Sequence, residues 1–225
     1  GPGLPVGTFA AVPGVRTAAG AFFDIDIQGK GGHGAYPHLA IDPIPIAAQL
    51  VNALQTVVSR STSPNDSVVF SITKIHAGGA YNVIPESARL SGTVRTFSMD
   101  KMRQIEAQVQ ELAQRTAAAF GASAALDFKV PFHPVVNDEA TTAFAGDVCA
   151  SIAGDGNVLL TGAPGTGSED FSFMAEQVPS CYLIIGNGED SNALHNPGYD
   201  FNDDAIVYGG SFFARVTEQE LVGVR

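Results

Sequence analysis

Over residues 20–130 the spacing of apolar residues switches between the period of a strand and the period of a helix. Apolar and polar residues alternate over residues 23–28, which is typical of a half-buried strand. Asp42 followed by Pro43 then predicts the N-cap and first residue of a helix. The helical spacing continues through Ala47, Leu50, Val51, Leu54, Val57 and Val58. One strand and one amphipathic helix are therefore expected here.

Two more strands, a second helix and a fourth strand are expected next. "SVVFSITKI" and "ARLSGTVRTF" have strand composition and are joined by a glycine-rich loop. Helical spacing then runs from Met99 to Phe120, and Gly121 is expected to end the helix. Alternation returns at residues 126–130. The order β-α-β-β-α-β is that of a ferredoxin-like sandwich, an α+β fold in which two helices cover one face of an antiparallel sheet.

From Asp138 onward the pattern is that of an α/β domain with too few strands. Helices are expected over residues 139–154, after Ser168 and from about 203 to 221. The apolar runs "NVLLTG" and "CYLIIG" resemble buried parallel strands. Two strands cannot cover three helices, so we expect half of an α/β domain whose other half is absent or lies in another chain.

Composition excludes several classes of function. The net charge of −11 disfavours binding to nucleic acid. No apolar run approaches the length of a membrane span, and the first ten residues lack the regions of a signal peptide. Cys149 and Cys181 stand in apolar contexts without metal or redox spacing, so both are expected to be buried thiols. A cytoplasmic protein that contacts neither membrane nor nucleic acid is expected.

"GKGGHG", residues 29–34, matches the dinucleotide-binding glycine pattern, but its context argues against that function. In a dinucleotide site the last glycine opens a helix, whereas here Pro37 delays the helix. Two interpretations remain for His33. It is either a loop histidine without a special task or an imidazole that donates a hydrogen bond to a developing oxyanion.

Two polar residues of the strand-loop-strand region also have competing interpretations. Asn82 lies in the glycine-rich loop before Pro85, where asparagine usually serves the turn itself. Arg95 is expected on the strand face opposite Leu90 and Val94. A strand arginine is commonly a solvated charge, but it can also clamp a substrate carboxylate with two hydrogen bonds.

Two loops that follow the predicted strands of the last segment carry further candidates. In "TGAPGTGSEDF", Ser168, Glu169 and Asp170 could cap the following helix, and Glu169 could support a metal or a substrate amine. His195 follows the second strand, and we expect it at the same end of the same sheet. One imidazole is a credible zinc or manganese ligand, but a catalytic metal needs about three protein ligands.

Four ordered motifs carry a resemblance to a known family. "GKGGHGAYPHLAIDPI", "AYNVIPESARLSGTVRTF", "GSEDFSFMAEQVP" and "LHNPGYDFND" resemble the aminoacylase and carboxypeptidase family of dinuclear metal amidohydrolases. The likeness is strongest to the branch of hippurate hydrolase, the indoleacetyl-amino acid hydrolases and other N-acyl-L-amino acid amidohydrolases. It extends over nearly the whole chain from Pro2.

The resemblance implies a domain organisation. Residues 20–130 would be an inserted ferredoxin-like dimerisation or lid domain, and residues 131–225 the C-terminal part of a zinc-peptidase-like α/β catalytic domain. Residues 1–19 would be the end of the N-terminal catalytic half and a linker. The rest of that half, which carries an H-x-C-G-H-D stretch, a glutamate pair and another histidine in the family, is expected to be missing here.

The resemblance also implies site residues. His195, in "LHNP", would be a metal ligand, and His33, in "GGHG", would stabilise the oxyanion in the partner subunit of a homodimer. Asn82 and Arg95 would hold the amide oxygen and the carboxylate of the substrate, and Glu169 is a further substrate contact. Two divalent metals, zinc or manganese and also cobalt or nickel, would activate the water that attacks an N-acyl amino acid. Most of the ligands are expected to be missing from this chain, so we expect it to bind no metal stably and to be inactive alone.

Two alternatives remain at this stage. The ferredoxin-like domain could be a non-catalytic dimerisation or amino acid-sensing module, with an exposed strand edge available to a second copy. The missing catalytic half could also belong to a separate polypeptide.

Overall fold

The computed structural model describes residues 1–222, and these divide into two compact units. The ferredoxin-like unit comprises residues 17–134 and 166–169. The terminal unit comprises residues 1–16, 135–165 and the chain from 170 onward. The last three residues of the predicted C-terminal segment 131–225 lie outside the described residues.

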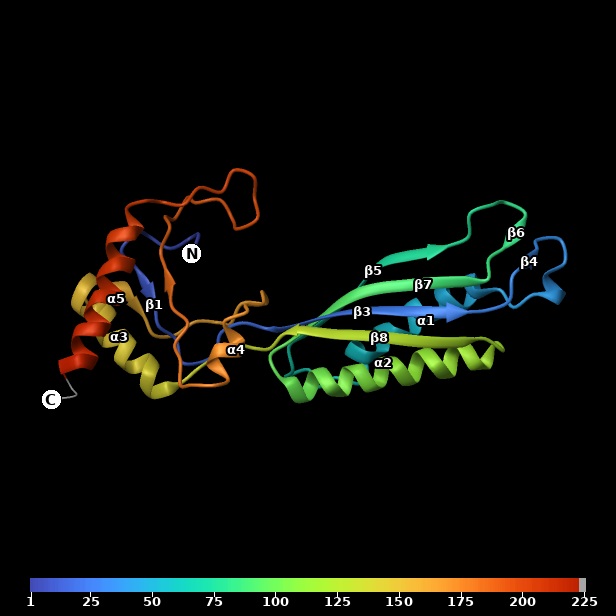
Figure 1. Ribbon diagram of the computed structural model, residues 1–225, viewed down its shortest axis with the longest axis horizontal. Helices are drawn as coiled ribbons and strands as arrows, with labels where there is room; N and C mark the ends of the chain where they lie inside the picture. Colours follow the sequence, from blue (N-terminus) through green and yellow to red (C-terminus); the bar gives the residue numbers. More distant parts are fainter. Residues whose placement is uncertain (223–225) are drawn as a thin grey trace. The chain divides into compact units, whose positions relative to one another are not determined.

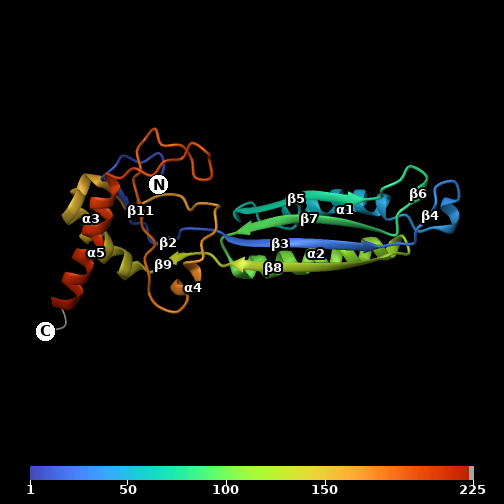
Figure 2. The same cartoon turned by 45° about the horizontal axis from the view of Figure 1, so that its top comes forward.

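The ferredoxin-like unit confirms the predicted order of elements. Its four-stranded sheet has the order β5-β7-β3-β8, and every pairing is antiparallel. Both helices cover the same face of this sheet (Figures 1 and 2). The elements are β3 (Ala19–Gln28), α1 (Pro43–Ser59), β5 (Val68–Ala77), β7 (Ser87–Thr96), α2 (Met99–Ala119) and β8 (Ser123–Phe132).

The ends of the two helices follow from local sequence. The Asp42 side chain accepts a hydrogen bond from the Ile44 amide at 2.9 Å, with Pro43 as the first helical residue of α1. Ser98 caps α2 in the same way. Gly121 follows the end of α2 with a φ of 77°, a conformation that glycine adopts without strain.

The core of this unit lies between the helices and the sheet. Fully buried side chains from both layers form it, and each contributes roughly 1.5–3 kcal/mol of apolar transfer free energy. The largest are Ile25, Ile27, Ile46, Leu50, Leu54, Leu90, Met102 and Ile105. The other sheet face is polar: Arg89 donates two hydrogen bonds to the Asp26 carboxylate, and Ser91 donates one to Asp24.

Beyond the ends of β3 and β7, the loops form a small two-stranded ladder. β4 (Gly32–His33) pairs antiparallel with β6 (Val83–Ile84), and the 3-10 turn η1 (Pro37–Leu39) follows β4. This ladder projects from the end of the sheet at which β3 finishes and β7 begins (Figure 1). The ladder fixes the loop after β3 in register against the loop before β7.

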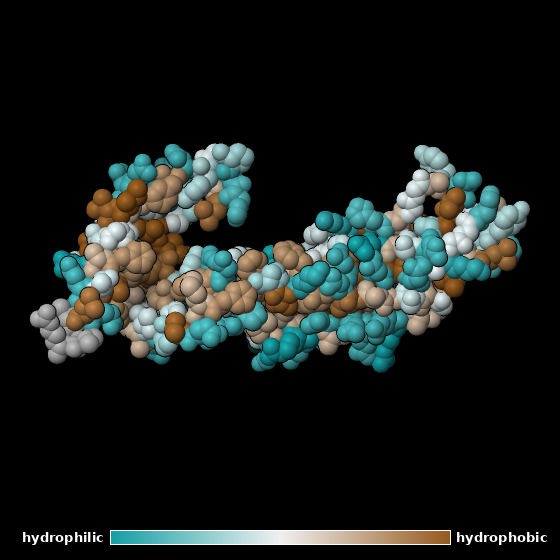
Figure 3. Space-filling view, in the orientation of Figure 1, coloured by the Kyte–Doolittle hydropathy of each residue, from teal (hydrophilic) through white to brown (hydrophobic). Residues whose placement is uncertain are grey.

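The terminal unit is an α/β arrangement with very short strands. The sheet order is β10-β1-β11, and a second ladder pairs β2 with β9. Exposed apolar residues on α5 include Ile206, Val207 and Phe213, and brown atoms gather on this unit in Figure 3. The elements are β1 (Phe9–Ala10), β2 (Gly14–Val15), β9 (Val136–Asn137), α3 (Glu139–Ala153), η2 (Asp155–Asn157), β10 (Val158–Leu159), α4 (Ser172–Ala175), β11 (Ile184–Ile185) and α5 (Ala205–Val222).

The direction of one strand corrects the sequence-based expectation. β10 runs parallel to β1, but β11 runs antiparallel to it. The loops after β10 and β11 therefore leave from opposite ends of this sheet, and the prediction that they leave from the same end is wrong. Gly186 permits a close approach here, because a Cβ there would lie 1.8 Å from the Pro5 carbonyl oxygen. The glycine lets the first segment of the chain run against β11.

None of the helices among residues 1–222 combines the length and the apolar character needed to cross a membrane.

Candidate functional site

His33 and Asn82 lie next to each other on the β4–β6 ladder. His33 pairs with Val83, and the Gly34 amide donates to the Asn82 carbonyl oxygen at 2.7 Å. Gly34 favours this approach, since a Cβ there would lie 3.2 Å from that oxygen, which is a tight contact. Both His33 and Asn82 are exposed. The loops thus present an imidazole and a carboxamide together at one end of the ferredoxin-like unit.

The hydrogen bonding of His33 selects one tautomer. Its Nδ1 accepts a hydrogen bond from the Ala35 amide at 3.1 Å. A ring nitrogen that accepts carries no proton, so the neutral imidazole is protonated at Nε2. The Tyr36 ring lies 5.5 Å from the imidazole, measured between ring centroids. His33 therefore offers an oriented Nε2–H donor, as oxyanion stabilisation requires.

Arg95 lies at the other end of the same sheet. It is half-buried on the face opposite the buried Leu90 and Val94, as predicted. Its guanidinium carbon lies 5.6 Å from the centroid of the Phe22 ring, and Nη1 donates a long 3.4 Å bond to the Val94 carbonyl. Arg95 forms no ion pair with any residue in the range 1–222. The planar N–H donors of its guanidinium group are therefore suited to binding an anion.

The length of the strands separates these two groups. Arg95 pairs with Gly20 near the start of β3, whereas the β4–β6 ladder follows the end of β3 at Gln28. At about 3.3 Å per residue, the strand between them spans roughly 25 Å. One copy of the unit therefore does not bring Arg95 together with His33 and Asn82.

Ser168 and Glu169 belong to a short segment that packs with the ferredoxin-like unit. The Ala18 amide donates to the Gly167 carbonyl at 2.9 Å, which ties the segment to the start of β3. Helix α4 begins only at Ser172, and the Ser168 hydroxyl is buried without a hydrogen-bond partner. A cap was expected from at least one of Ser168, Glu169 and Asp170, and Ser168 does not provide it. The reason is tertiary packing, which directs its hydroxyl toward Gly20.

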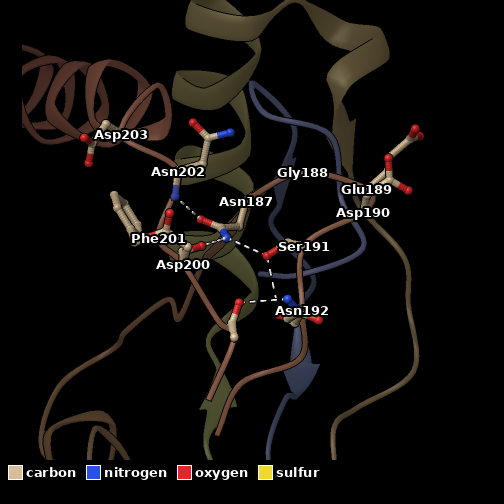
Figure 4. Close-up of a pocket in the computed structure, with 11 residues that line it drawn as sticks. Asn187, Gly188, Glu189, Asp190, Ser191, Asn192, Asp200, Phe201, Asn202 and Asp203 are labelled. Carbon is tan, nitrogen blue, oxygen red and sulfur yellow. Dashed lines mark hydrogen bonds between the residues drawn. The ribbon is translucent and has the colours of Figure 1, made fainter. Parts of the chain in front are cut away.

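His195 lies in an exposed loop that an asparagine network holds in shape. Asn187 is 5% exposed; its Nδ2 donates to the Ser191 hydroxyl and the Asp200 carbonyl, and its Oδ1 accepts from the Asn202 amide (Figure 4). Asn192 donates to the Gly198 carbonyl at 2.7 Å. His195 has a φ of 64°, the single positive value at a non-glycine residue in the described chain.

Sequence reasoning missed the role of Asn187. The available signal was its position directly after an apolar strand, at the start of a loop rich in asparagine and glycine, where such side chains hydrogen-bond the backbone.

The residues present do not by themselves fit a dinuclear metal centre. Within residues 1–222 no group of three or more histidine, cysteine, aspartate or glutamate side chains is placed to hold a metal ion. His195 is one candidate ligand, and a catalytic metal needs about three. No catalytic step through a metal can be derived from this chain.

The cysteines are free and do not form a reactive site. Cys149 is fully buried, and burial raises the pKa of its thiol to about 12. Burial also raises the pKa of Cys181, which is partly exposed. Both thiols are therefore poor nucleophiles at neutral pH, and the prediction of a buried thiol is confirmed in full for Cys149.

Comparison with known proteins gives a match to one domain family and several similar enzymes. Residues 16–120 match the peptidase dimerisation domain of the M20 family. The chain is 36% identical over 217 residues to an N-acetylcysteine deacetylase of Bacillus subtilis, covering 96% of this chain and 56% of that protein. It is 34% identical over 230 residues to the IAA-amino acid hydrolase ILR1-like 4 of Arabidopsis thaliana, covering 99% and 52%.

A solved structure agrees with these relatives. A Bacillus subtilis protein described as a dinuclear metal binding peptidase from the M20 family superposes with a TM-score of 0.77 at 29% identity, covering 95% of this chain and 53% of that one. The chain is thus similar in sequence and fold to M20 peptidases, and the ferredoxin-like unit contains most of the residues that match the peptidase dimerisation domain. The chain spans about half the length of the curated relatives it matches.

Proposed function

We propose that this sequence belongs to a metal-dependent amidohydrolase that cleaves the amide bond of N-acyl amino acids such as hippurate. The relatives support the reaction class, since both act on N-acylated amino acids by name. The observation that carries the proposal is the exposed pair of His33 and Asn82, with an oriented Nε2–H donor, on a unit matched to a peptidase dimerisation domain.

In this proposal each polar group has a defined task. The Nε2–H of His33 stabilises the negative charge that develops on the amide oxygen, and Asn82 binds the same oxygen before the reaction. Arg95 binds the substrate carboxylate with its fork of donors. Glu169 contacts the substrate. His195 is a metal ligand, but the identity of the metals, zinc or manganese before cobalt or nickel, remains a prediction because residues 1–222 do not supply a complete site.

The separation along the sheet supports a homodimeric enzyme. His33 and Asn82 would act together, because they share the β4–β6 ladder, and they would enter the site of the partner subunit. Arg95, roughly 25 Å away along β3, would serve the site of its own subunit. A substrate that spans from carboxylate to amide is far shorter than this distance. Two subunits are therefore required to complete each site.

Hydrolysis by a longer protein that contains this sequence tests the proposal. With zinc, manganese, cobalt or nickel supplied, we expect release of free amino acid from N-acyl amino acids. His33→Ala should lower kcat on the order of 10²- to 10³-fold, as removal of an oxyanion donor does elsewhere. Arg95→Ala should raise KM mainly for substrates with a free carboxylate. Absence of hydrolysis across a panel of acyl groups and all four metals would contradict the proposal.

Residues 1–225 alone should be inactive in the same assay, because they supply no complete metal site among the described residues. Measurable hydrolysis of hippurate by the purified chain would contradict this expectation. We also propose a cytoplasmic location, which the two free cysteines support.

A second candidate function is dimerisation or amino acid sensing without catalysis. The match of residues 16–120 to a dimerisation domain favours it. A sensing module should show a rise in melting temperature on adding an amino acid, whereas a dimerisation module should respond to protein concentration alone.

A further inference from the structure

We propose that Tyr81 is a specificity-determining residue whose ring packs against the acyl group of the substrate and favours flat aromatic acyl groups over acetyl. The inference rests on the proposed function, in which Asn82 binds the amide oxygen in the site of the partner subunit. It adds a determinant for the acyl end of the substrate, where the proposed function assigns no residue.

The backbone around Tyr81 is held in place. Tyr81 directly precedes Asn82 in the loop between β5 and β6 (Figure 1). The Gly34 amide donates to the Asn82 carbonyl oxygen at 2.7 Å, and Val83 pairs with His33. Tyr81 is therefore fixed at its backbone beside the two groups that are proposed to bind the amide oxygen.

The ring of Tyr81 is free to meet a ligand. Tyr81 is fully exposed, and its ring contacts no other aromatic ring within residues 1–222. The Tyr36 ring differs, because its centroid lies 5.5 Å from that of His33 and 6.3 Å from that of His38. A tyrosine has only two side-chain torsions, so ordering the free ring on a ligand costs little entropy.

The covalent structure of the substrate brings the acyl group to this ring. In an N-acyl amino acid, the acyl group and the nitrogen are bonded to the carbonyl carbon whose oxygen Asn82 binds in the proposed function. The amino acid extends through the nitrogen toward Arg95, and the acyl group extends from the other side of the carbon. Consecutive Cα atoms are about 3.8 Å apart, so the Tyr81 side chain starts within reach of the acyl group.

A tyrosine ring discriminates between acyl groups by shape. A benzoyl group offers a flat ring, which gains from offset-stacked or edge-to-face contact beyond the burial of its area. An acetyl group offers a single methyl and loses most of this contact. The phenol hydroxyl can stay in water while the ring is covered, so the ring carries the preference. Flat aromatic acyl groups are therefore the class that Tyr81 favours.

Hippurate and N-acetylglycine form a matched pair of substrates, because they differ only in the acyl group. The experiment measures kcat/KM for both in the longer protein with metal supplied, and the ratio of the two values is independent of protein concentration and metal loading. Tyr81→Ala should lower the ratio of hippurate to N-acetylglycine about three- to tenfold, the range expected for one aromatic contact. Tyr81→Phe should keep the ratio, because the ring remains.

Three results would overturn the proposal. They are an unchanged ratio in Tyr81→Ala, an equal loss of kcat/KM on both substrates, and a loss in Tyr81→Phe as large as that in Tyr81→Ala. Phe120→Ala is the matched control, since it removes an exposed aromatic ring that follows α2 in the same unit. This control should leave the ratio unchanged, and Tyr81→Ala should keep the melting temperature of the wild type because the side chain is fully exposed.

Mixed dimers test whether Tyr81 acts in the site of the partner subunit. In a dimer of one His33→Ala and one Arg95→Ala subunit, the intact site takes Arg95 from the first and the β4–β6 ladder from the second. Adding Tyr81→Ala to the Arg95→Ala subunit should lower the ratio, while adding it to the His33→Ala subunit should not. Equal effects or the reverse pattern would overturn the placement.

The failure of this inference differs from the failure of the proposed function. If the longer protein hydrolyses neither substrate with any of the four metals, the proposed function fails and the assignment of Tyr81 fails with it. If both substrates are hydrolysed and Tyr81→Ala leaves the ratio unchanged, only the assignment of Tyr81 fails.

Discussion

At the residue scale, two glycines decide where functional side chains can lie. Gly34 lets the His33 loop pack against the Asn82 backbone, and Gly20 leaves the space that Arg95 and Ser168 share. At each place a crowding atom belongs to a residue proposed to bind substrate, Asn82 beside Gly34 and Arg95 beside Gly20. Neither glycine has a positive φ. Each therefore matters because it lacks a Cβ and leaves room for a neighbouring residue.

Gly20→Ala should displace Arg95 without unfolding the protein. The added methyl would lie 2.3 Å from Nη1, but the atoms that must move are the ends of side chains and not backbone. We expect a melting temperature close to that of the wild type and, in the longer protein, a raised KM for N-acyl amino acids with a free carboxylate. An unchanged KM would show that the guanidinium does not need this space.

Cys149 should be unreactive in the folded protein. Burial raises the pKa of its thiol to about 12, so almost no thiolate is present at pH 8. A thiol reagent should label Cys149 orders of magnitude more slowly in buffer than in denaturant, with mass spectrometry of the digested protein as the readout. Equal labelling rates in both conditions would contradict the buried position.

At the element scale, caps and periodicity explain most of the helices. Asp42 with Pro43 marks the start of α1, and Ser98 and Gly121 bracket α2, so these helices are predictable from local chemistry. β1 was not predictable, since two residues carry no periodicity and the strand exists through pairing on both sides. The direction of β11 was predicted wrongly for a related reason, because an apolar run does not determine which strand it pairs with.

Leu50→Ala should destabilise the ferredoxin-like unit by about 2–5 kcal/mol, the usual cost of a cavity at a fully buried leucine. Leu50 is fully buried between α1 and the sheet. The matched control is Gln49→Ala, an exposed neighbour on the same helix, which should change the free energy of unfolding by less than about 0.5 kcal/mol. Urea unfolding measures both, and equal effects would contradict the assigned core.

The cap of α3 should make the terminal unit sensitive to acid. The Asp138 carboxylate accepts hydrogen bonds from the backbone amide and the hydroxyl of Thr141, and these lower its pKa below the ordinary value of 3.8. The stabilisation is therefore complete above pH 3.8 and is lost as the pH falls through the lowered pKa.

Asp138→Asn should keep the hydrogen bonds of the N-cap, but its side chain does not titrate. Thermal unfolding between pH 7 and pH 2 should thus show a smaller acid-induced loss of stability for Asp138→Asn than for the wild type. A steeper acid-induced loss of stability in the variant would contradict the claim that the Asp138 cap causes the acid sensitivity.

At the scale of the whole molecule, the candidate residues differ in how far the sequence predicted their placement. His33 and Asn82 lie on loops whose strands were predictable, so their placement at one end of the sheet follows from the β-α-β-β-α-β order. Ser168 was one of three candidates for a helix cap, because nothing in "TGSEDF" reveals its packing against Gly20. The predicted domain boundaries and site roles remain predictions.

The central claim is that each site needs groups from two subunits. Mixing impaired variants of the longer protein, at a substrate concentration far below the KM of Arg95→Ala, measures this directly. His33→Ala and Arg95→Ala subunits, once exchanged into random dimers, should recover about a quarter of wild-type hydrolysis, because half the dimers then contain one intact site. His33→Ala mixed with Asn82→Ala should recover none, since both residues come from one ladder. Recovery in the second mixture but not in the first would contradict the claim.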